Sequence, residues 1–341
     1  MTEKISNKSS LPDRKNIIRS LILILLVGLS IYIAVVLWFG WTNFVMVFRG
    51  LGLSVFLIAG VVSSFAYVFR FARWHYTLFY LGCKVPVWVN FKIYLAGMSL
   101  TASPAKLGET VRSALLLPYG VKVQFSLAAF FADRATDVLG VSLLGVLVGL
   151  SAKKSVWVFA SIFVMILIVG CLLRFLGNCR EDSRFWFWFS QTFRWLPIVH
   201  SRHLLNTWAE LWTVGKIATF TLLALIAYGL QAIVFGWFCS KTGIFVPFAD
   251  AILIFVQATL FGAASMIPGG LGAMEAALVV QLAQYGVENS LAVSVAIATR
   301  FVTFWLGLII GFLALASSLN SFRAQKDDAP NGSKKIEVTS G

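Results

Sequence analysis

Long runs without a charged residue are the feature that most restricts how this chain can fold. Residues 20–48, 155–173 and 217–240 contain no Asp, Glu, Lys or Arg. About 20 consecutive apolar residues can cross the hydrocarbon core of a bilayer as a helix. Of the 341 residues, 59% are hydrophobic and 12% are charged, whereas a soluble domain carries about 25% charged residues. We therefore predict an all-α, polytopic membrane protein and exclude a soluble enzyme, a secreted disulfide-rich domain and a DNA-binding domain.

Six segments are long and apolar enough to be full membrane spans. They lie at about residues 17–39, 51–69, 125–150, 155–173, 217–240 and 291–318. Two further apolar segments, at about residues 88–117 and 251–285, are interrupted by Pro104 and Pro268, respectively. The pieces beside these breaks are too short to cross a bilayer core. This pattern predicts two broken, re-entrant helix pairs; the alternative is a chain with eight spans.

The distribution of Lys and Arg predicts how the chain is oriented. We expect residues 1–16 to form a cytoplasmic arm, residues 174–216 a basic cytoplasmic loop and residues 319–341 a disordered cytoplasmic tail. With the N-terminus inside, the predicted cytoplasmic segments hold 19 Lys and Arg residues and the outer segments hold 4. Because Lys and Arg accumulate in cytoplasmic loops, both termini are predicted in the cytoplasm of a multi-pass protein of the cell membrane. The same rule explains the net charge of +14 without nucleic acid as a partner.

An internal repeat relates two halves of the chain, residues 17–150 and 151–318. The spacing between Glu109 and Arg134 in the sequence equals the spacing between Glu275 and Arg300. We expect each Glu to approach the Arg of its own half. Each half contains two spans, a broken helix pair and one more span. Three crossings is an odd number, so the second half is predicted to be inverted, as in many transporters that bind substrate near the midplane.

Eight ionisable residues fall in or beside the predicted membrane segments. They are Lys106, Glu109, Arg112, Asp133, Arg134, Asp137, Glu275 and Arg300. Four are basic and four are acidic, so we expect them to neutralise one another, because an unpaired charge in the membrane is costly. The i, i+4 spacing places Asp133 and Asp137 on one helix face, whereas Arg134 is expected to face a different partner.

The glycine-rich segment after Pro268 is a candidate for anion binding. Gly269, Gly270 and Gly272 precede a short predicted helix, and backbone N–H groups at a helix N-terminus attract anions. The Cys and His residues lack metal-ligand spacing, and no nucleophile or Walker motif occurs in the sequence. We therefore predict no metal, no cofactor and no catalytic residue.

Four motifs together resemble a known family. They are the segments Ser103–Arg112 (SPAKLGETVR), Ala132–Gly140 (ADRATDVLG) and Ile267–Glu275 (IPGGLGAME), and the pair Thr299-Arg300. In this order they resemble the lysylphosphatidylglycerol synthase transmembrane family, also called flippase-like integral membrane proteins, over about residues 17–318. Asp133 and Lys106 stand where that family more often has Glu and Arg.

The resemblance implies a stand-alone lipid flippase without an aminoacyl-transfer domain. Such a protein would move an anionic or zwitterionic phospholipid, or a lipid-linked sugar, between leaflets. Lys106, Arg112, Arg134 and Arg300 would then contact the headgroup phosphate, while the four acidic residues hold these bases and meet any headgroup amine. A small-solute transporter and a non-transporting scaffold for an envelope-lipid or glycan enzyme are the alternatives, with an enzyme third. Partners considered are the lipid, a second copy of the chain and an envelope-biosynthesis enzyme.

Overall fold

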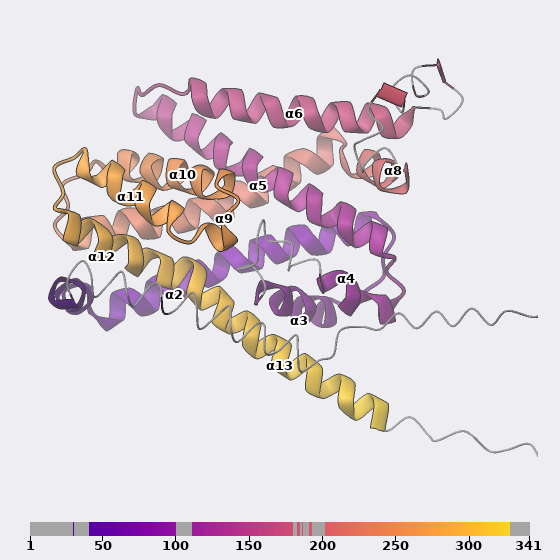
Figure 1. The fold of residues 1–341 in the computed structure, drawn as a ribbon, viewed down its shortest axis with the longest axis horizontal. Helices are drawn as coiled ribbons and strands as arrows, with labels where there is room; N and C mark the ends of the chain where they lie inside the picture. The colour runs from indigo at the N-terminus through magenta and orange to yellow at the C-terminus, as the bar shows by residue number, and fades with distance from the viewer. Residues whose placement is uncertain are drawn as a thin grey trace, which may run out of the picture.

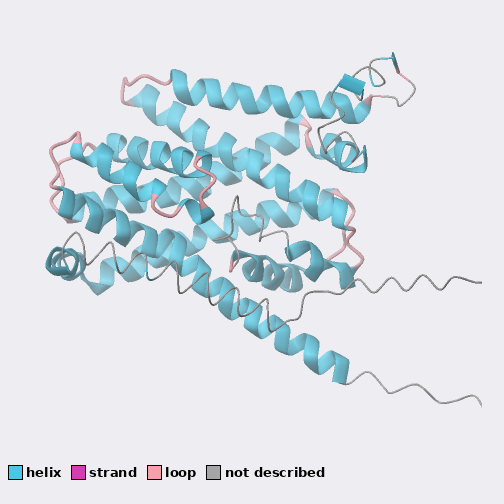
Figure 2. Ribbon diagram, in the orientation of Figure 1, coloured by secondary structure: helices cyan, strands magenta, loops and turns pink. Residues whose placement is uncertain are grey.

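The computed structural model describes residue 30, residues 41–99, 111–179 and 202–327, and five positions between 183 and 192. Within these ranges every regular element is a helix (Figure 2). An unpaired backbone N–H or C=O group is costly in lipid, and a helix pairs these groups within the segment itself. The predicted all-α class is confirmed.

The chain contains both long and short helices (Figure 1). The elements are α2 (Trp41–Tyr80), α3 (Val87–Met98), α4 (Val111–Leu116), η2 (Leu117–Tyr119), α5 (Val123–Ser151), α6 (Trp157–Asn178), α8 (Arg202–Leu211), α9 (Val214–Lys241), α10 (Phe248–Ala264), η4 (Pro268–Gly270), α11 (Ala273–Ala283), α12 (Asn289–Arg300), η5 (Phe301–Trp305, a π-helix) and α13 (Leu306–Asp327).

Five helical segments are long and apolar enough to cross a membrane. They are Val47–Tyr80, Val123–Ser151, Trp157–Asn178, Val214–Lys241 and Asn289–Ser317. Each of them contains or closely matches one of the predicted spans. The remaining predicted span, residues 17–39, lies outside the described residues. The chain is therefore a multi-pass integral membrane protein.

The predicted end of the second span at Phe69 is wrong. Helix α2 continues to Tyr80, so that Arg70 and Arg73 lie within it. The sequence places both arginines among the cytoplasmic residues because they end the apolar run. Both instead have partners inside the helix bundle, which allows the helix to continue past them. The number of basic residues in the predicted cytoplasmic segments falls from 19 to 17.

Short helices occupy the segments that were predicted to be broken. Helices α3, α10 and α11 have 12, 17 and 11 residues, which at about 1.5 Å per residue is less than the thickness of a bilayer core, about 30 Å. The break between α10 and α11 is made by η4, where Gly269 and Gly270 have φ values of 63° and 64°. Glycine adopts this left-handed conformation without steric cost. Pro104 lies outside the described residues, and re-entry of either pair stays a prediction.

The order of elements is similar in the two halves. A long helix, a pair of short helices and another long helix follow one another as α2, α3–α4 and α5, and again as α9, α10–α11 and α12–α13. This order agrees with the predicted repeat. The inverted relation of the halves and the boundary between residues 150 and 151 stay predictions.

Helix α5 lies at the centre of the described fold, where it packs against α6, α9 and α10. Its crossing with α9 is close because Gly140 has no side chain; a Cβ atom there would lie 2.5 Å from the Cβ of Ala224. Small residues allow such close helix contacts in membranes, where the apolar environment adds little driving force for association. This packing brings the middle of α5 beside α2, α9 and α10, the helices that surround the candidate site.

Candidate functional site

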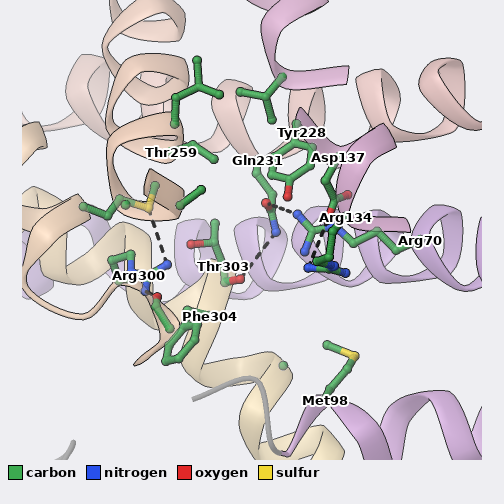
Figure 3. A pocket seen from close by; sticks show the side chains of 18 of the residues that line it. Arg70, Met98, Arg134, Asp137, Tyr228, Gln231, Thr259, Arg300, Thr303 and Phe304 are labelled. Atoms are coloured by element: carbon green, nitrogen blue, oxygen red, sulfur yellow. Dashed lines mark hydrogen bonds and ion pairs between the residues drawn. The ribbon is translucent and has the colours of Figure 1, made fainter. Parts of the chain in front are cut away.

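A cavity of about 320 Å³ lies among the helices (Figure 3). The charged residues that line it, among those described, are four arginines and one carboxylate: Arg70, Arg112, Arg134, Arg300 and Asp137. Figure 3 shows Arg300 on one side of the cavity and Arg70 with Arg134 on the other. This excess of guanidinium groups makes the wall attractive to an anion.

The cavity lies near the middle of the membrane-spanning helices. Among the residues that line it, Asp137 is the central residue of α5 (Val123–Ser151). Thr303 is the central residue of the segment Asn289–Ser317, and Tyr228 lies at the middle of α9. At about 1.5 Å per residue, each is roughly 20 Å from the helix ends. Ionisable residues at such a depth mark functional sites in membrane proteins.

A network of two arginines and two aspartates joins α2 to α5. Arg73 donates through Nε to Asp133 at 2.5 Å and through Nη2 to Asp137 at 2.6 Å. Arg134 donates to Oδ2 of Asp133 at 2.8 Å and forms an ion pair with Oδ2 of Asp137 at 3.1 Å. Each aspartate is thus paired with both arginines. The expectation that the two aspartates share one face is confirmed.

Arg134 forms ion pairs with both aspartates, which its predicted position on another face of the helix did not lead us to expect. The spacing i, i+3 places Arg134 beside Asp137 on the helix, and its long side chain also reaches back to the adjacent Asp133. Glu109, the partner expected for Arg134, lies outside the described residues, as does Lys106. The pairing of Glu109 with Arg134 therefore stays a prediction.

Arg73 and Arg70 are the site residues that the sequence analysis missed. Arg73 is 1% exposed and holds both aspartates. Arg70 lines the cavity, donates through Nη2 to Oε1 of Gln231 at 2.9 Å and lies 4.5 Å from the centre of the Tyr228 ring. The signal that could have placed both in the membrane is the largely apolar sequence that follows them, Trp74–Leu81.

Arg300 and Glu275 form the ion pair that their spacing predicted. Nε of Arg300 donates to Oε1 of Glu275 at 2.8 Å, so this expectation is confirmed. Nη2 of Arg300 donates to the carbonyl oxygen of Gly269 at 2.7 Å, and the guanidinium lies 4.3 Å from the centre of the Phe304 ring. A carboxylate, a loop carbonyl and an aromatic ring thus fix the orientation of this arginine.

The glycine-rich loop contributes a carbonyl to the arginine. Gly269 and Gly270 line the cavity, but Gly272 is not among the residues that line it. The N–H of Gly270 donates to the carbonyl of Ile267 at 2.8 Å, and the carbonyl of Gly269 accepts from Arg300. Binding of an anion by the backbone N–H groups of this loop stays a prediction.

Arg112 is held among aromatic rings. Its guanidinium lies 5.0 Å from the centre of the Trp74 ring and 4.2 Å from that of Tyr94, and the residue is 2% exposed. A Cβ atom at Gly97 would collide with its side chain. Cation–π contacts stabilise a desolvated guanidinium and leave its charge in place.

A π-helix follows Arg300 directly and shapes the floor of the cavity. In η5 the carbonyl of Thr303 accepts from the hydroxyl of Tyr67 at 3.1 Å and from Nε2 of Gln231 at 3.4 Å. π-Helical turns inside α-helices occur frequently at functional sites. Gln231 therefore links Arg70 on α2 to the irregular turn after Arg300.

The charges of the core do not cancel as the sequence analysis expected. Five described arginines, Arg70, Arg73, Arg112, Arg134 and Arg300, face three carboxylates, Asp133, Asp137 and Glu275. Lys106 and Glu109, which lie outside the described residues, add one charge of each sign. The core set carries a net charge of +2 because Arg70 and Arg73 belong to it. In the part of the chain that is described, no three His, Cys, Asp or Glu residues gather to hold a metal ion.

The fold and the cavity define a multi-pass helical membrane protein with a cationic site between its helices. The chain belongs to the family described as the lysylphosphatidylglycerol synthase TM region, whose model matches residues 24–311. The resemblance inferred from the sequence motifs is thereby confirmed.

Two similar proteins come from Methanothermobacter thermautotrophicus (strain Delta H), and each is described as a UPF0104 membrane protein. One is 24% identical over 305 residues, which covers 83% of this chain and 89% of the relative. The other is 25% identical over 286 residues, which covers 76% of this chain and 85% of the relative.

Proposed function

We propose that this protein is a flippase that moves a phosphate-containing lipid between the two leaflets of the cell membrane. The candidates are an anionic or zwitterionic phospholipid and a lipid-linked sugar. The observation that carries the proposal is the cavity lined by four arginines near the middle of the spans. Membership of a family named for the membrane region of a lipid-modifying enzyme supports it.

The cavity wall is suited to hold a lipid phosphate at the depth where water is scarce. A guanidinium binds phosphate oxygens through two parallel N–H bonds. Arg134 and Arg300 lie on opposite sides of the cavity (Figure 3), so a headgroup between them could exchange contacts from one to the other. Tyr67, Met98 and Phe304 supply the less polar part of the lining. We propose that Lys106, from the undescribed segment, acts with these arginines.

We propose that the predicted inverted repeat supplies a means of alternating access. If the broken helix pairs α3–α4 and α10–α11 rock against the long helices, the cavity opens to one leaflet at a time. In this mechanism the Pro/Gly break at η4 acts as the flexible joint. The chain itself performs no chemical step on the lipid.

Translocation in reconstituted vesicles tests the proposal. The purified protein is placed in vesicles with trace lipids that carry a fluorescent acyl chain, and an impermeant reductant bleaches the outer leaflet. A flippase increases the bleached fraction above the level reached in protein-free vesicles. A bleached fraction that stays at the protein-free level for phospholipids and for a lipid-linked sugar would contradict it.

Small-solute transport is the second candidate because a soluble anion could occupy the same cavity. The matched experiment traps radiolabelled inorganic phosphate inside the same vesicles. Efflux of phosphate without lipid movement would favour this alternative. Absence of both activities in folded protein would favour a scaffold for an envelope-building enzyme.

A further inference from the structure

Two arginines on one face of α2 have different surroundings. Arg73 forms ion pairs with Asp133 and Asp137. Arg70, one turn earlier, contacts neutral groups, the amide of Gln231 and the ring of Tyr228. Among the described residues Arg70 forms no ion pair, whereas Arg73 does. Arg70 lines the cavity, and Arg73 is not part of its lining. The two residues therefore have different roles.

Arg70 retains N–H donors after its contacts with the protein are made. A guanidinium has five N–H donors, and Arg70 donates one of them to Gln231. Its Nε has no hydrogen-bond partner among the described residues. Gln231 in turn donates to the carbonyl of Thr303, which fixes the amide and, with it, the position of the guanidinium.

In the described part of the lining, no carboxylate is left over for a headgroup amine. Asp137 is the one carboxylate in the described part of the wall. Its Oδ1 accepts from Arg73, and its Oδ2 is ion-paired with Arg134. An ammonium group entering the cavity would have to displace one of these buried arginines, which would leave that arginine without its partner at a large cost.

We infer that Arg70 is a ligand of the headgroup phosphate and that the cavity selects lipids whose phosphate charge is not balanced by an ammonium group. The inference rests on the proposed function and narrows its substrate class to anionic headgroups. The net charge of +2 on the core residues favours a ligand that brings one or two negative charges, because a net charge buried in a membrane is costly. A phosphodiester lipid brings one such charge, and a phosphomonoester lipid brings up to two.

Equilibrium binding to the purified protein in micelles of an uncharged detergent tests the inference independently of transport. The ligands are short-chain phosphatidylglycerol, phosphatidic acid, phosphatidylcholine and lysylphosphatidylglycerol, together with inorganic phosphate. We expect the two anionic lipids to bind at least about tenfold more tightly than the two lipids that carry an ammonium group, a ratio typical of one charge-assisted hydrogen bond. The tighter of the two anionic lipids identifies a diester or a monoester headgroup.

The variant Arg70→Gln tests the role of the residue. It should lose about 10- to 100-fold in affinity for the preferred anionic lipid, and its weak binding of phosphatidylcholine should fall by a smaller factor. Arg49→Gln is the matched control, because it removes an exposed arginine from the part of α2 that precedes its kink at Gly52. Arg70→Lys should recover part of the lost affinity, since it restores the charge without the planar guanidinium.

Several results would overturn the inference. These are equal binding of anionic and ammonium-bearing lipids by the wild-type protein, binding of none of the lipids, or unchanged affinity in folded Arg70→Gln. Inorganic phosphate that binds as tightly as the lipids would overturn the lipid assignment. If Arg70→Gln does not fold, the wild-type ranking still decides the headgroup selectivity, and unchanged affinity in Arg70→Lys would overturn the role of the planar guanidinium. Selective binding without translocation would refute the flippase proposal alone, and translocation without headgroup selectivity would refute this inference alone.

Discussion

Arg73 is the residue on which the contact between α2 and α5 depends most. Replacing it with Gln removes one partner from each of two buried aspartates, Asp133 and Asp137, and leaves them with Arg134. Breaking a buried ion pair in this way costs about 3–5 kcal/mol. We expect Arg73→Gln to lower the thermal unfolding midpoint in detergent strongly, with Arg49→Gln as the exposed control. A midpoint equal to that of the wild type would refute the structural role assigned to Arg73.

Substitution of Arg300 separates phosphate binding from simple charge pairing. Arg300→Lys keeps the positive charge beside Glu275 but loses the planar pair of N–H donors, so translocation should fall while the unfolding midpoint stays near the wild-type value. Arg300→Gln should also destabilise the protein, by about 3–5 kcal/mol, because it leaves a largely buried carboxylate without its cation. Both quantities are measured on the same preparations. If the Arg300→Lys protein is stable and fully active, Arg300 does not bind phosphate through its planar guanidinium and serves only as the ion-pair partner of Glu275.

Contacts between individual residues were predictable where their spacing in the sequence alone determines them. The helical period placed Asp133 and Asp137 on one face, and the repeat predicted the pair of Glu275 and Arg300. The ion pairs of Arg134 with these aspartates were not predicted, because the helical angle of a Cα atom does not limit where a long flexible side chain can reach. The role of Arg70 was not predictable, since its partner Gln231 is 161 residues away in the sequence.

At the scale of elements, the close crossing of α5 and α9 depends on Gly140. A methyl group there would meet the Cβ of Ala224 and the backbone of Leu225. We expect Gly140→Ala to destabilise the protein by about 1–3 kcal/mol, the usual cost of overpacking. Gly229→Ala on α9 is the matched control, because nothing lies within 4 Å of its Cβ position. That control should be neutral or slightly stabilising, since Ala favours a helix more than Gly does. Equal unfolding midpoints for the two variants would contradict this account.

Hydropathy located the helices well and their ends poorly. Long, largely apolar segments identified all five described spans, because each must bury its apolar surface in lipid or in the bundle. The end of α2 was missed because hydropathy treats Arg70 and Arg73 as a boundary. Inside a bundle, an arginine that has a carboxylate or amide partner does not end a helix, and such partners become visible only in three dimensions.

For the whole molecule, the sequence predicted a symmetric core with cancelling charges, and the structure has a cationic one. Arg70 and Arg73, which were predicted to lie at the cytoplasmic surface, lie in the interior. Their charges make the core cationic and therefore change the ligand that it favours. Loops that were predicted to lie outside the membrane, which join α5 to α6, α9 to α10 and α11 to α12, gather at one end of the molecule, at the left in Figure 2. The loop between α2 and α3 and helix α8 lie toward the other end (Figure 1). This separation agrees with a single crossing by each of the long helices.

The orientation of the chain is predicted from the basic residues that remain at or beyond the ends of the predicted spans. Of these, 17 lie in segments predicted to be cytoplasmic and 4 in segments predicted to be outside, so both termini should be cytoplasmic. In a background where the four native cysteines are replaced by Ser, Cys is introduced at Ser10, at Ser333 or, as the outer control, at Ala152 after the end of α5. An impermeant thiol reagent added to intact cells should label only Ala152→Cys, and permeabilisation should expose the other two. Labelling of either terminal position in intact cells would refute the topology, and with it the inverted relation of the two halves that the alternating-access mechanism requires.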